Sequence, residues 1–495
     1  MICVRVNDES YSYDIHSLIK AFYPEEDIKV EPFDTDKNSD SNMPEFLVCA
    51  NKNNISIDLE GRSVSNIPIE DSLYEDRAAY KSELKKQLYL ALSKHTGKEL
   101  PWGTLTGIRP TKLAKTCLDN GMNTADTIRH MKEFYLCSDE KANLATEIAI
   151  REKKVIDEIG ADASGYSLYI GIPFCPSRCL YCSFMSYPIA LHKEAVARYI
   201  DSVKKEIDYV ASSFSGRRLD SIYIGGGTPT TLDAESLADL IGYVKDKIDT
   251  TSIREFTVEA GRADSIDEGK LKAIKSLGVD RISVNPQTFN EDTLKLIGRK
   301  ATAAETIKAY KLAREIGFDN INMDIILGLP GETIDDIKYT LDNIAALKPD
   351  DLTVHSLAVK RGSKLAEMLR DGNKITDTDV MLRNNVIDYD EAMRLTQDTA
   401  ASIGLHPYYL YRQKNIRGNL ENTGYAADGK AGIYNILMME EVQDIVALGA
   451  GTVSKRVYKD AEEGRIERCD THKDLMLYID NIDEMIARKR RLYEA

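Results

Sequence analysis

Three cysteines lie close enough together in the sequence to bind one metal centre. The segment Gly171-Ile-Pro-Phe-Cys175-Pro-Ser-Arg-Cys179-Leu-Tyr-Cys182 places them in a Cys-x3-Cys-x2-Cys array, and its two prolines favour a loop. A [4Fe–4S] cluster takes one cysteine per iron, so a cluster that is held by three cysteines leaves one iron open to another ligand. The array therefore predicts an iron–sulfur cluster with an open iron at which chemistry can start.

A zinc site and a chance grouping of thiols remain open as alternatives to the cluster. A structural zinc ion could use His192 or a distant thiol as its fourth ligand, but zinc sites usually show paired Cys-x2-Cys or His spacings, and the chain has no second pair. In the second alternative the three thiols bind no metal. The remaining five cysteines are scattered, as expected for reduced, buried thiols, at Cys3, Cys49, Cys117, Cys137 and Cys469.

Further polar or glycine-rich positions follow predicted strands. The string Gly225-Gly-Gly-Thr-Pro229 would let the backbone approach a ligand closely, although it lacks the pattern of a phosphate loop or a dinucleotide fingerprint. Glu259, Gln287 and Asp324 also lie at or near predicted strand ends. Functional residues of α/β barrels gather at the C-terminal ends of the strands, so together these residues predict a site there.

The elements that must position these residues alternate between strands and helices from about residue 165 to 360. Amphipathic stretches separate short β-branched runs, as in βα units around a parallel sheet. The predicted strands are Ser167–Ile172, Ser221–Ile224, Glu255–Glu259, Arg281–Asn285, Asn320–Ile326 and Asp351–Ser356. Six such units predict an α/β fold with a partial (β/α)6 barrel of the TIM type.

The length of 495 residues suggests roughly three domains. We expect an N-terminal accessory domain over residues 1–160, with a small α/β unit followed by helices, the barrel over 161–375, and an α+β extension over 376–495. Long helices are predicted at Asp377–Ile403 and Lys473–Arg491. The segment around Trp102, the only tryptophan, is interpreted as a structural loop, with a ligand-binding or partner-binding loop as the alternative.

Composition and charge exclude several classes of protein. The chain has 43% hydrophobic and 29% charged residues, which is typical of a soluble globular protein, and it lacks the ~18 consecutive apolar residues of a membrane span. The acidic start of the chain does not resemble a secretory signal, so we expect a cytoplasmic location. The net charge of −15 argues against nucleic acid. Residues 77–154, with 15 basic and 9 acidic side chains, are the only support for an RNA-modifying role, and we interpret them as a solvated surface.

The Cys-x3-Cys-x-aromatic-Cys array after a strand resembles the signature of the radical S-adenosylmethionine (SAM) superfamily, with Tyr181 at the aromatic position. This resemblance implies that the amino and carboxylate groups of SAM chelate the open iron. It also implies that an electron from the cluster cleaves SAM to a 5′-deoxyadenosyl radical. The glycine-rich turn would bind the methionine part of SAM.

The longer strings resemble the oxygen-independent coproporphyrinogen III oxidase (HemN-like) group. The N-terminal region, with Pro-Trp-Gly-Thr-Leu-Thr-Gly-Ile-Arg-Pro, is similar to the HemZ-type subgroup. The resemblance implies Cys175, Cys179 and Cys182 as cluster ligands and Tyr169 and Glu259 as catalytic residues. The implied SAM-binding residues are Tyr169, Tyr181, Gly226, Gly227, Thr228, Glu259, Gln287, Arg299 and Asp324, with Ala358 and Val453 as weaker matches.

The sequence departs from this group at two positions beside the array. Phe184 stands where HemN proper carries a fourth cysteine, and Gly171 stands where it carries a histidine. Both departures could change substrate placement or the exit of an electron. The heme-chaperone branch carries a His-Asn…Tyr-Trp string, which this chain lacks because Trp102 is its only tryptophan.

The resemblance implies a specific reaction, the oxidative decarboxylation of coproporphyrinogen III to protoporphyrinogen IX. The partners would be a tetrapyrrole substrate and a reduced flavodoxin or ferredoxin as electron donor. Basic side chains expected near the propionates of the substrate are Arg178, Lys360 and Arg361, with Arg109 or Lys112 as candidates if the N-terminal domain covers the site. The alternatives are a heme-binding or heme-delivery protein of the same family, and another radical SAM reaction on a tetrapyrrole.

Overall fold

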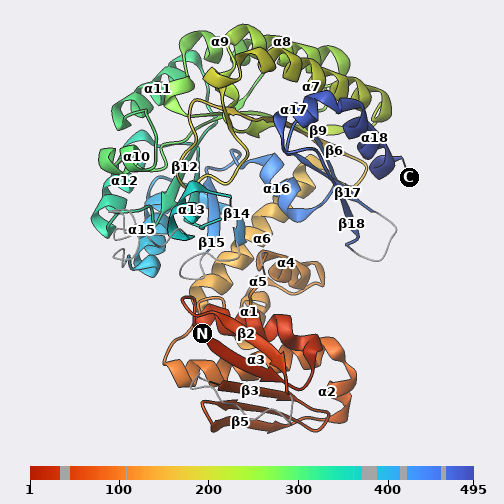
Figure 1. The fold of residues 1–495 in the computed structure, drawn as a ribbon, viewed down its shortest axis with the longest axis vertical. Helices are drawn as coiled ribbons and strands as arrows, with labels where there is room; N and C mark the ends of the chain where they lie inside the picture. Colours follow the sequence, from red (N-terminus) through yellow and green to blue (C-terminus); the bar gives the residue numbers. More distant parts are fainter. Residues whose placement is uncertain are drawn as a thin grey trace. The chain divides into compact units, whose positions relative to one another are not determined.

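The computed structural model describes residues 1–33, 45–107, 109–360, 362–370, 387–412, 421–458 and 464–494. The chain divides into two compact units (Figure 1). The first comprises Met1–Ile150 and Arg412–Leu420, and the second comprises Arg151–Tyr411 and Glu421–Ala495. Within the described ranges, no helix is both long and apolar enough to cross a membrane.

The first unit begins with a five-stranded sheet in the order β2-β1-β3-β4-β5. β1 runs parallel to β2 and β3, and β3, β4 and β5 are antiparallel. Helices α1 (Ser12–Phe22) and α3 (Arg77–Thr96) pack their apolar residues into one core with those of the sheet. The strands are β1 (Ile2–Val6), β2 (Ile28–Pro32), β3 (Glu45–Ala50), β4 (Asn54–Leu59) and β5 (Arg62–Pro68).

Three helices follow, namely α4 (Thr111–Asp119), α5 (Thr124–Glu133) and α6 (Asp139–Ile159). The loop before α4 buries Trp102 completely, and the Cys137 thiol lies 3.6 Å from the Trp102 carbonyl oxygen. Arg412 lies over the indole, 5.8 Å from the ring centroid. These contacts support the structural interpretation of the Trp102 side chain, since a fully buried ring has no face for a ligand.

The second unit contains an eleven-stranded sheet, and all six predicted barrel strands are confirmed within two residues at each end. Neighbouring strands among the six are parallel. In spatial order they are β6 (Tyr166–Ile172), β9 (Leu219–Gly226), β10 (Glu255–Gly261), β11 (Arg281–Val284), β12 (Ile321–Leu327) and β13 (Asp351–Ser356). Their C-terminal ends therefore meet at one edge of the sheet.

Helices connect these strands and lie on the outer side of the sheet (Figure 1). A capping box of Thr302 and Glu305 is present at the start of α11 (Ala303–Ile316), and Gly317 ends that helix with φ of 101°. The other connecting helices include α7 (Lys193–Ser213), α8 (Ala234–Lys247), α9 (Glu268–Ser276), α10 (Glu291–Leu296) and α12 (Ile334–Leu347).

Polar and apolar residues alternate along the barrel strands. In β6 and β9, Ser167 pairs in register with Ser221, and Tyr169 pairs with Tyr223. Between them are apolar residues such as Leu168, which are fully buried. Parallel strands are usually apolar on both faces, so a polar row on one face indicates a lumen that is built to hold something other than a packed core.

The C-terminal segment adds strands to the barrel sheet. β16 (Asp444–Leu448) is parallel to β6, whereas β17 (Val453–Val457) is antiparallel to β16 and to β18 (Ile466–Asp470). At the opposite edge, β15 (Glu421–Ala426) lies between β13 and β14 (His406–Arg412). The boundary predicted near residue 375 lies outside the described residues, and the three-domain division stays a prediction.

The two long helices predicted near the C-terminus differ from the structure. α15 spans Tyr389–Ser402, and the predicted start at Asp377 lies outside the described residues. The single helix predicted at Lys473–Arg491 is wrong, because α17 (Leu475–Asp480) and α18 (Ile482–Tyr493) are separate helices. Asn481 breaks them, with φ of −120° and its side-chain amide donating to the Leu477 carbonyl at 2.8 Å.

Candidate functional site

The cysteine array follows the C-terminal end of β6. Cys175 closes the two-residue strand β7 (Phe174–Cys175), which pairs with β8 (Tyr187–Pro188). Cys175 and Cys179 are buried, and Cys182 is half-buried. The Leu180 amide donates to the Ile297 carbonyl at 2.9 Å, which ties the centre of the loop to the segment after α10. The loop is therefore held in place by backbone hydrogen bonds on both sides.

Two arginines hold the cysteine loop, and only one of them was singled out in the sequence. Arg178 donates to the carbonyl oxygens of Cys182, at 3.4 Å, and of Gly362, so its guanidinium anchors the loop. Arg262 is buried, donates to the Ser177 carbonyl at 2.9 Å, and lies 3.7 Å from the Cys179 sulfur. Its guanidinium therefore places a buried positive charge beside one of the three predicted cluster ligands.

Burial raises the pKa of the Cys175 thiol, while a contact of 3.5 Å with the Thr228 hydroxyl acts in the opposite direction. Burial also raises the pKa of Cys182. The thiolate is the form that binds metal, so iron binding must release protons from these two side chains. Cluster loading should therefore be favoured at higher pH.

The glycine-rich turn lies directly against the cysteine loop. The Gly227 and Thr228 amides donate to the carbonyls of Ile172 and Phe174, at 2.8 and 2.7 Å. A methyl group on Gly227 would lie 2.5 Å from the Phe174 oxygen and 3.1 Å from the Cys175 sulfur. Gly226 has φ of 106°, which favours glycine. The turn thus needs glycine both for its backbone conformation and for its closeness to the cysteines.

Glu259 is hydrogen-bonded to one of three tyrosines whose rings stack on one another. Its Oε1 accepts a hydrogen bond from the Tyr223 hydroxyl at 2.5 Å, and its Oε2 accepts one from the Gly226 amide at 3.3 Å. The Tyr223 ring stacks on Tyr169, with centroids 6.0 Å apart, and on Tyr434, with centroids 4.6 Å apart. The two predicted catalytic residues, Tyr169 and Glu259, are therefore brought together by Tyr223.

Burial raises the pKa of Glu259 to about 7, and the charge of Asp324 acts in the same direction. For Asp324, burial also acts upward, but His355 and Asn322 outweigh it and the pKa is lowered. His355 Nε2 lies 3.9 Å from Asp324, and the Asn322 amide donates to it at 2.7 Å. One carboxyl group can thus carry a proton near neutral pH while its neighbour stays ionised, as in sites with divided acid–base roles.

The raised pKa of Glu259 predicts a pH-dependent effect of Glu259→Gln on stability. The folded protein holds the proton more tightly than the unfolded chain, whose pKa is near 4.5, so this contribution to stability is complete below pH 4.5 and is lost as pH rises through 7. The side-chain amide of the Glu259→Gln variant does not titrate, so the stability of the variant does not fall in this way as pH rises. Relative to the wild type, the melting temperature of the variant should rise by about 2 °C or more between pH 5 and 8. Exposed Glu315→Gln is the control, and an equal difference at both pH values would contradict the assignment.

Gln287 combines an unusual backbone with an unsatisfied side chain. Its φ is 68°, a left-handed conformation that is uncommon for residues other than glycine. Its amide donates to the Asp324 carbonyl at 2.9 Å, which fixes the backbone, but its buried Oε1 has no hydrogen-bond partner among the described residues. The buried Asn285 Oδ1 is likewise without one. Strain and unsatisfied buried polar atoms together indicate a place where a polar ligand binds.

Arg299 contacts Tyr181, which lies between Cys179 and Cys182 in the cysteine loop. Arg299 donates to the Asn285 carbonyl at 2.5 Å and to the Tyr181 hydroxyl at 3.5 Å. Burial acts to lower the pKa of Arg299, but the nearby Tyr181 and Cys179 raise it overall, so the guanidinium stays charged. The arginine thus links the cysteine loop to the strand end that carries Gln287.

Ala358 and Val453, the two weaker matches to the family pattern, make fewer contacts of their own with the rest of the site. Ala358 is half-buried after β13, and the Val453 side chain is 41% exposed at the start of β17. No side-chain hydrogen bond is available to either residue, so only backbone or apolar contact with a ligand is open to them. Their role as SAM contacts stays a prediction.

The residues present fit a three-cysteine [4Fe–4S] cluster with SAM. The three thiols of the array are free of disulfides. Within the described part of the chain, no three His, Cys, Asp or Glu side chains converge as ligands of a single ion. Cluster cysteines bind different irons, so they need not converge in that way. The unsatisfied amide oxygens of Asn285 and Gln287 add acceptors for the amino and hydroxyl groups of a ligand such as SAM.

Comparisons with known proteins agree with this site. The sequence profile of the radical SAM superfamily matches residues 169–344. The oxygen-independent coproporphyrinogen-III oxidase-like protein HemZ of Bacillus subtilis (strain 168) is 40% identical over 410 residues, which cover 81% of this chain and 79% of HemZ. The heme chaperone HemW of the same organism is 35% identical over 207 residues, covering 42% of this chain and 54% of HemW.

The fold is also similar to a solved structure. Coproporphyrinogen III oxidase (HemN) from Escherichia coli aligns with a TM-score of 0.50 and 20% identity, covering 68% of this chain and 73% of that chain. The fold, the site and these relatives define a radical SAM protein. Within that superfamily, the chain belongs to the group of oxygen-independent coproporphyrinogen III oxidase-like proteins, on the HemZ side. The cofactors of this family are a [4Fe–4S] cluster and SAM.

The sequence analysis did not predict several residues that the structure places at the site. Arg262, Tyr223, Tyr434 and His355 all contact predicted site residues or the residues beside them. A signal existed for Tyr223 and His355, because both belong to the polar rows that alternate with apolar residues along β9 and β13. Tyr434 carried no such signal, since it comes from α16 (Ile433–Glu440), far along the chain from the barrel strands.

Proposed function

We propose that this protein catalyses the oxidative decarboxylation of coproporphyrinogen III to protoporphyrinogen IX, with a reduced flavodoxin or ferredoxin as the electron donor. The observation that carries the proposal is the meeting of the cysteine loop, the glycine-rich turn and Glu259 at the mouth of a polar lumen. Similarity to HemZ over 81% of the chain supports the same reaction class.

Each of two propionate side chains loses one hydrogen atom, one carbon dioxide and one electron, which leaves a vinyl group. When bound, the cluster supplies the electron that cleaves SAM, and SAM supplies the fragment that accepts the hydrogen atom. The protein binds both partners, holds Glu259 beside Tyr223, and keeps water away from the lumen. The acceptor of the remaining substrate electron is a further reactant, an external oxidant.

A flat aromatic ring and a cation lie beside the cysteine loop, as a tetrapyrrole with propionate groups requires. The Phe184 side chain is 63% exposed, and the Lys360 ammonium lies 5.8 Å from the centroid of its ring. Lys360 is exposed and forms no ion pair with any residue that the structure describes. Arg178 is less suited to bind a propionate, because it already anchors the loop. Arg361 lies outside the described residues, and Arg109 and Lys112 stay predictions.

Lys360→Met should raise the KM for coproporphyrinogen III by roughly 10-fold, the effect of losing one hydrogen bond to a charged group. The affinity for SAM and the slow cleavage of SAM without substrate should not change, because Lys360 is assigned to the substrate alone. Lys364→Met, an exposed lysine four residues away, is the matched control. Equal KM changes in the two variants would contradict the assignment.

Heme delivery without decarboxylation is the second candidate, and the match to HemW favours it specifically. The two functions separate in one anaerobic experiment on the reconstituted protein. Formation of 5′-deoxyadenosine together with loss of two carboxyl groups from coproporphyrinogen III supports the enzyme. Tight heme binding in a spectral titration, with no change in the porphyrinogen mass, supports the carrier and overturns the decarboxylase.

A further inference from the structure

Helix α7 carries a buried carboxylate, Glu206, to which the proposed reaction assigns no role. Glu206 is fully buried and forms an ion pair with Lys489 of α18, which is also fully buried. Its Oε2 accepts hydrogen bonds from the Gly449 amide at 2.8 Å and from the Tyr478 hydroxyl at 2.5 Å. A buried charge is costly unless it is paired, so this side chain requires its partners.

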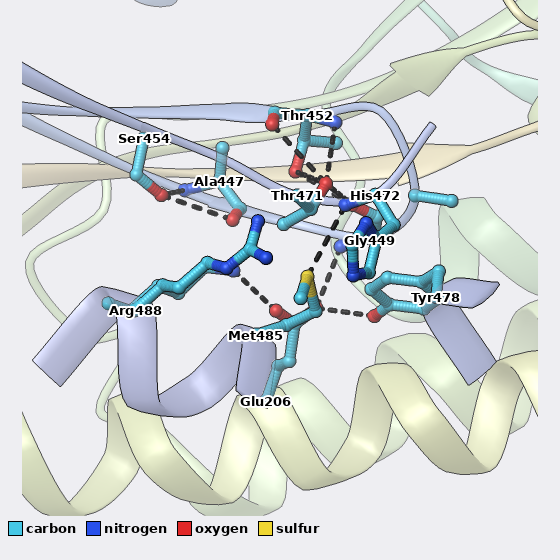
Figure 2. A network of polar contacts seen from close by, with 12 residues as sticks. Glu206, Ala447, Gly449, Thr452, Ser454, Thr471, His472, Tyr478, Met485 and Arg488 are labelled. Carbon is cyan, nitrogen blue, oxygen red and sulfur yellow. Dashed lines mark hydrogen bonds and ion pairs between the residues drawn. The ribbon is translucent and has the colours of Figure 1, made fainter. Parts of the chain in front are cut away.

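One of these partners, Gly449, is the first residue of the turn between β16 and β17, residues Gly449–Thr452 (Figure 2). Thr471 Oγ1 donates to the Gly449 carbonyl at 2.7 Å, and Thr452 Oγ1 donates to the same oxygen at 2.8 Å. The Thr452 amide donates to Thr471 Oγ1 at 3.0 Å. The turn is thus held from helix α7 on one side and from the end of β18 on the other.

Tyr199 connects this turn to the strand that leads into the cysteine loop. Its hydroxyl donates to the Gly171 carbonyl at 2.5 Å and accepts from the Ala450 amide at 3.1 Å. Tyr199 is fully buried, and its ring packs on Tyr478, with centroids 5.4 Å apart. One hydroxyl therefore joins the turn to the backbone four residues before Cys175.

The turn lies at the same edge of the sheet as the predicted SAM site. β16 is parallel to β6, so residues after Leu448 emerge at the same edge as the cysteine loop. The Thr452 methyl group lies where a side chain of Gly171 would be, because a Cβ there would come within 2.6 Å of it. The threonine thus occupies the space that a histidine would need at position 171.

We propose that Tyr199 and Glu206 are positioning residues for the SAM site, through which the C-terminal helices hold the Gly449–Thr452 turn against the end of β6. Neither residue is a cysteine ligand of the cluster or one of the predicted SAM-binding residues, although the Tyr199 ring packs on Phe174 with centroids 5.5 Å apart. Their hydrogen bonds fix the position of the turn, which precedes Val453, and the position of the Gly171 carbonyl. Gly171 is followed by Ile172, whose carbonyl accepts a hydrogen bond from the Gly227 amide. The proposal rests on the cofactors of the family and is independent of the identity of the substrate.

Tyr199→Phe tests the proposal with the smallest change, because it removes two hydrogen bonds and keeps the ring. Tyr209→Phe is the matched control, since Tyr209 is buried in the same helix and its hydroxyl makes no hydrogen bond to this network. Thr471→Val is a second variant that removes the contacts of the turn from the other side. SAM affinity is measured on the cluster-loaded protein from the change in the electron paramagnetic resonance spectrum of the reduced cluster.

Tyr199→Phe and Thr471→Val should each weaken SAM binding about 10-fold, with iron content within 20% or so of the control. Tyr209→Phe should bind SAM as the wild type does, whatever its melting temperature. Unchanged SAM affinity in both test variants would overturn the proposal. Loss of iron in Tyr199→Phe but not in Tyr209→Phe would overturn it as well, because the network would then serve the cluster loop rather than SAM.

Discussion

Cys179→Ala is expected to abolish SAM cleavage, with a loss on the order of 1,000-fold or more, equivalent to about 4 kcal/mol. The remaining two cysteines can bind only two irons of the cluster. The substitution also removes the sulfur that lies 3.7 Å from the buried Arg262 guanidinium. The measurements are iron and sulfide per protein after anaerobic reconstitution, and 5′-deoxyadenosine formed with dithionite.

Cys117→Ala is the matched control for this loss. Cys117 is also a buried free cysteine, but it lies on α4 in the first unit. The control should keep its full iron content and its rate of SAM cleavage. A Cys179→Ala protein that retains a SAM-cleaving cluster would contradict the assignment of the array as the cluster site.

Gly227→Ala is expected to lower the rate of SAM cleavage nearly as much as Cys179→Ala does, although it adds only one methyl group. The added carbon would lie 2.5 and 2.8 Å from the carbonyl oxygens of Phe174 and Ile172, so the backbone of the turn or of the cysteine loop must move. A displacement of about 1 Å at a reacting centre can cost on the order of 100-fold in rate. SAM affinity and SAM cleavage should both fall by at least this factor.

Gly242→Ala provides the control for Gly227→Ala. Gly242 lies within α8, and an added Cβ there would meet no atom within 4 Å. Alanine should stabilise the helix by roughly 1 kcal/mol and leave SAM binding unchanged. If Gly227→Ala behaved like Gly242→Ala, the close approach of the turn to the cysteine loop would be wrong.

The barrel could be predicted from the sequence because each strand carries its own signal. β-branched runs and the amphipathic stretches between them are local features, and they located all six strands within two residues. The C-terminal strands were not assigned to the same sheet, because pairing between β16 and β6 joins segments more than 270 residues apart. Local patterns do not report such pairing.

The residues of the candidate site that could be predicted from the sequence are likewise those with a local signal. The cysteines follow a strand directly, and the glycine-rich turn and Glu259 lie at the C-terminal ends of two others. They were predicted because functional residues of α/β barrels gather at these ends. Glu206 was missed because it lies among the apolar positions of an amphipathic helix, and its partners Lys489 and Tyr478 lie more than 270 residues further on. Arg262 was missed because its contact with Cys179 depends on the path of the loop and not on any spacing.

The most direct test of the central claim uses coproporphyrinogen III with deuterium at the β-carbons of its propionates. The reconstituted protein is incubated anaerobically with SAM and a reductant, and both products are analysed by mass spectrometry. We predict a porphyrinogen that has lost two carboxyl groups and 5′-deoxyadenosine that carries deuterium. Unlabelled 5′-deoxyadenosine with an intact porphyrinogen would contradict the proposed reaction, because the hydrogen atom would then come from a source other than this substrate.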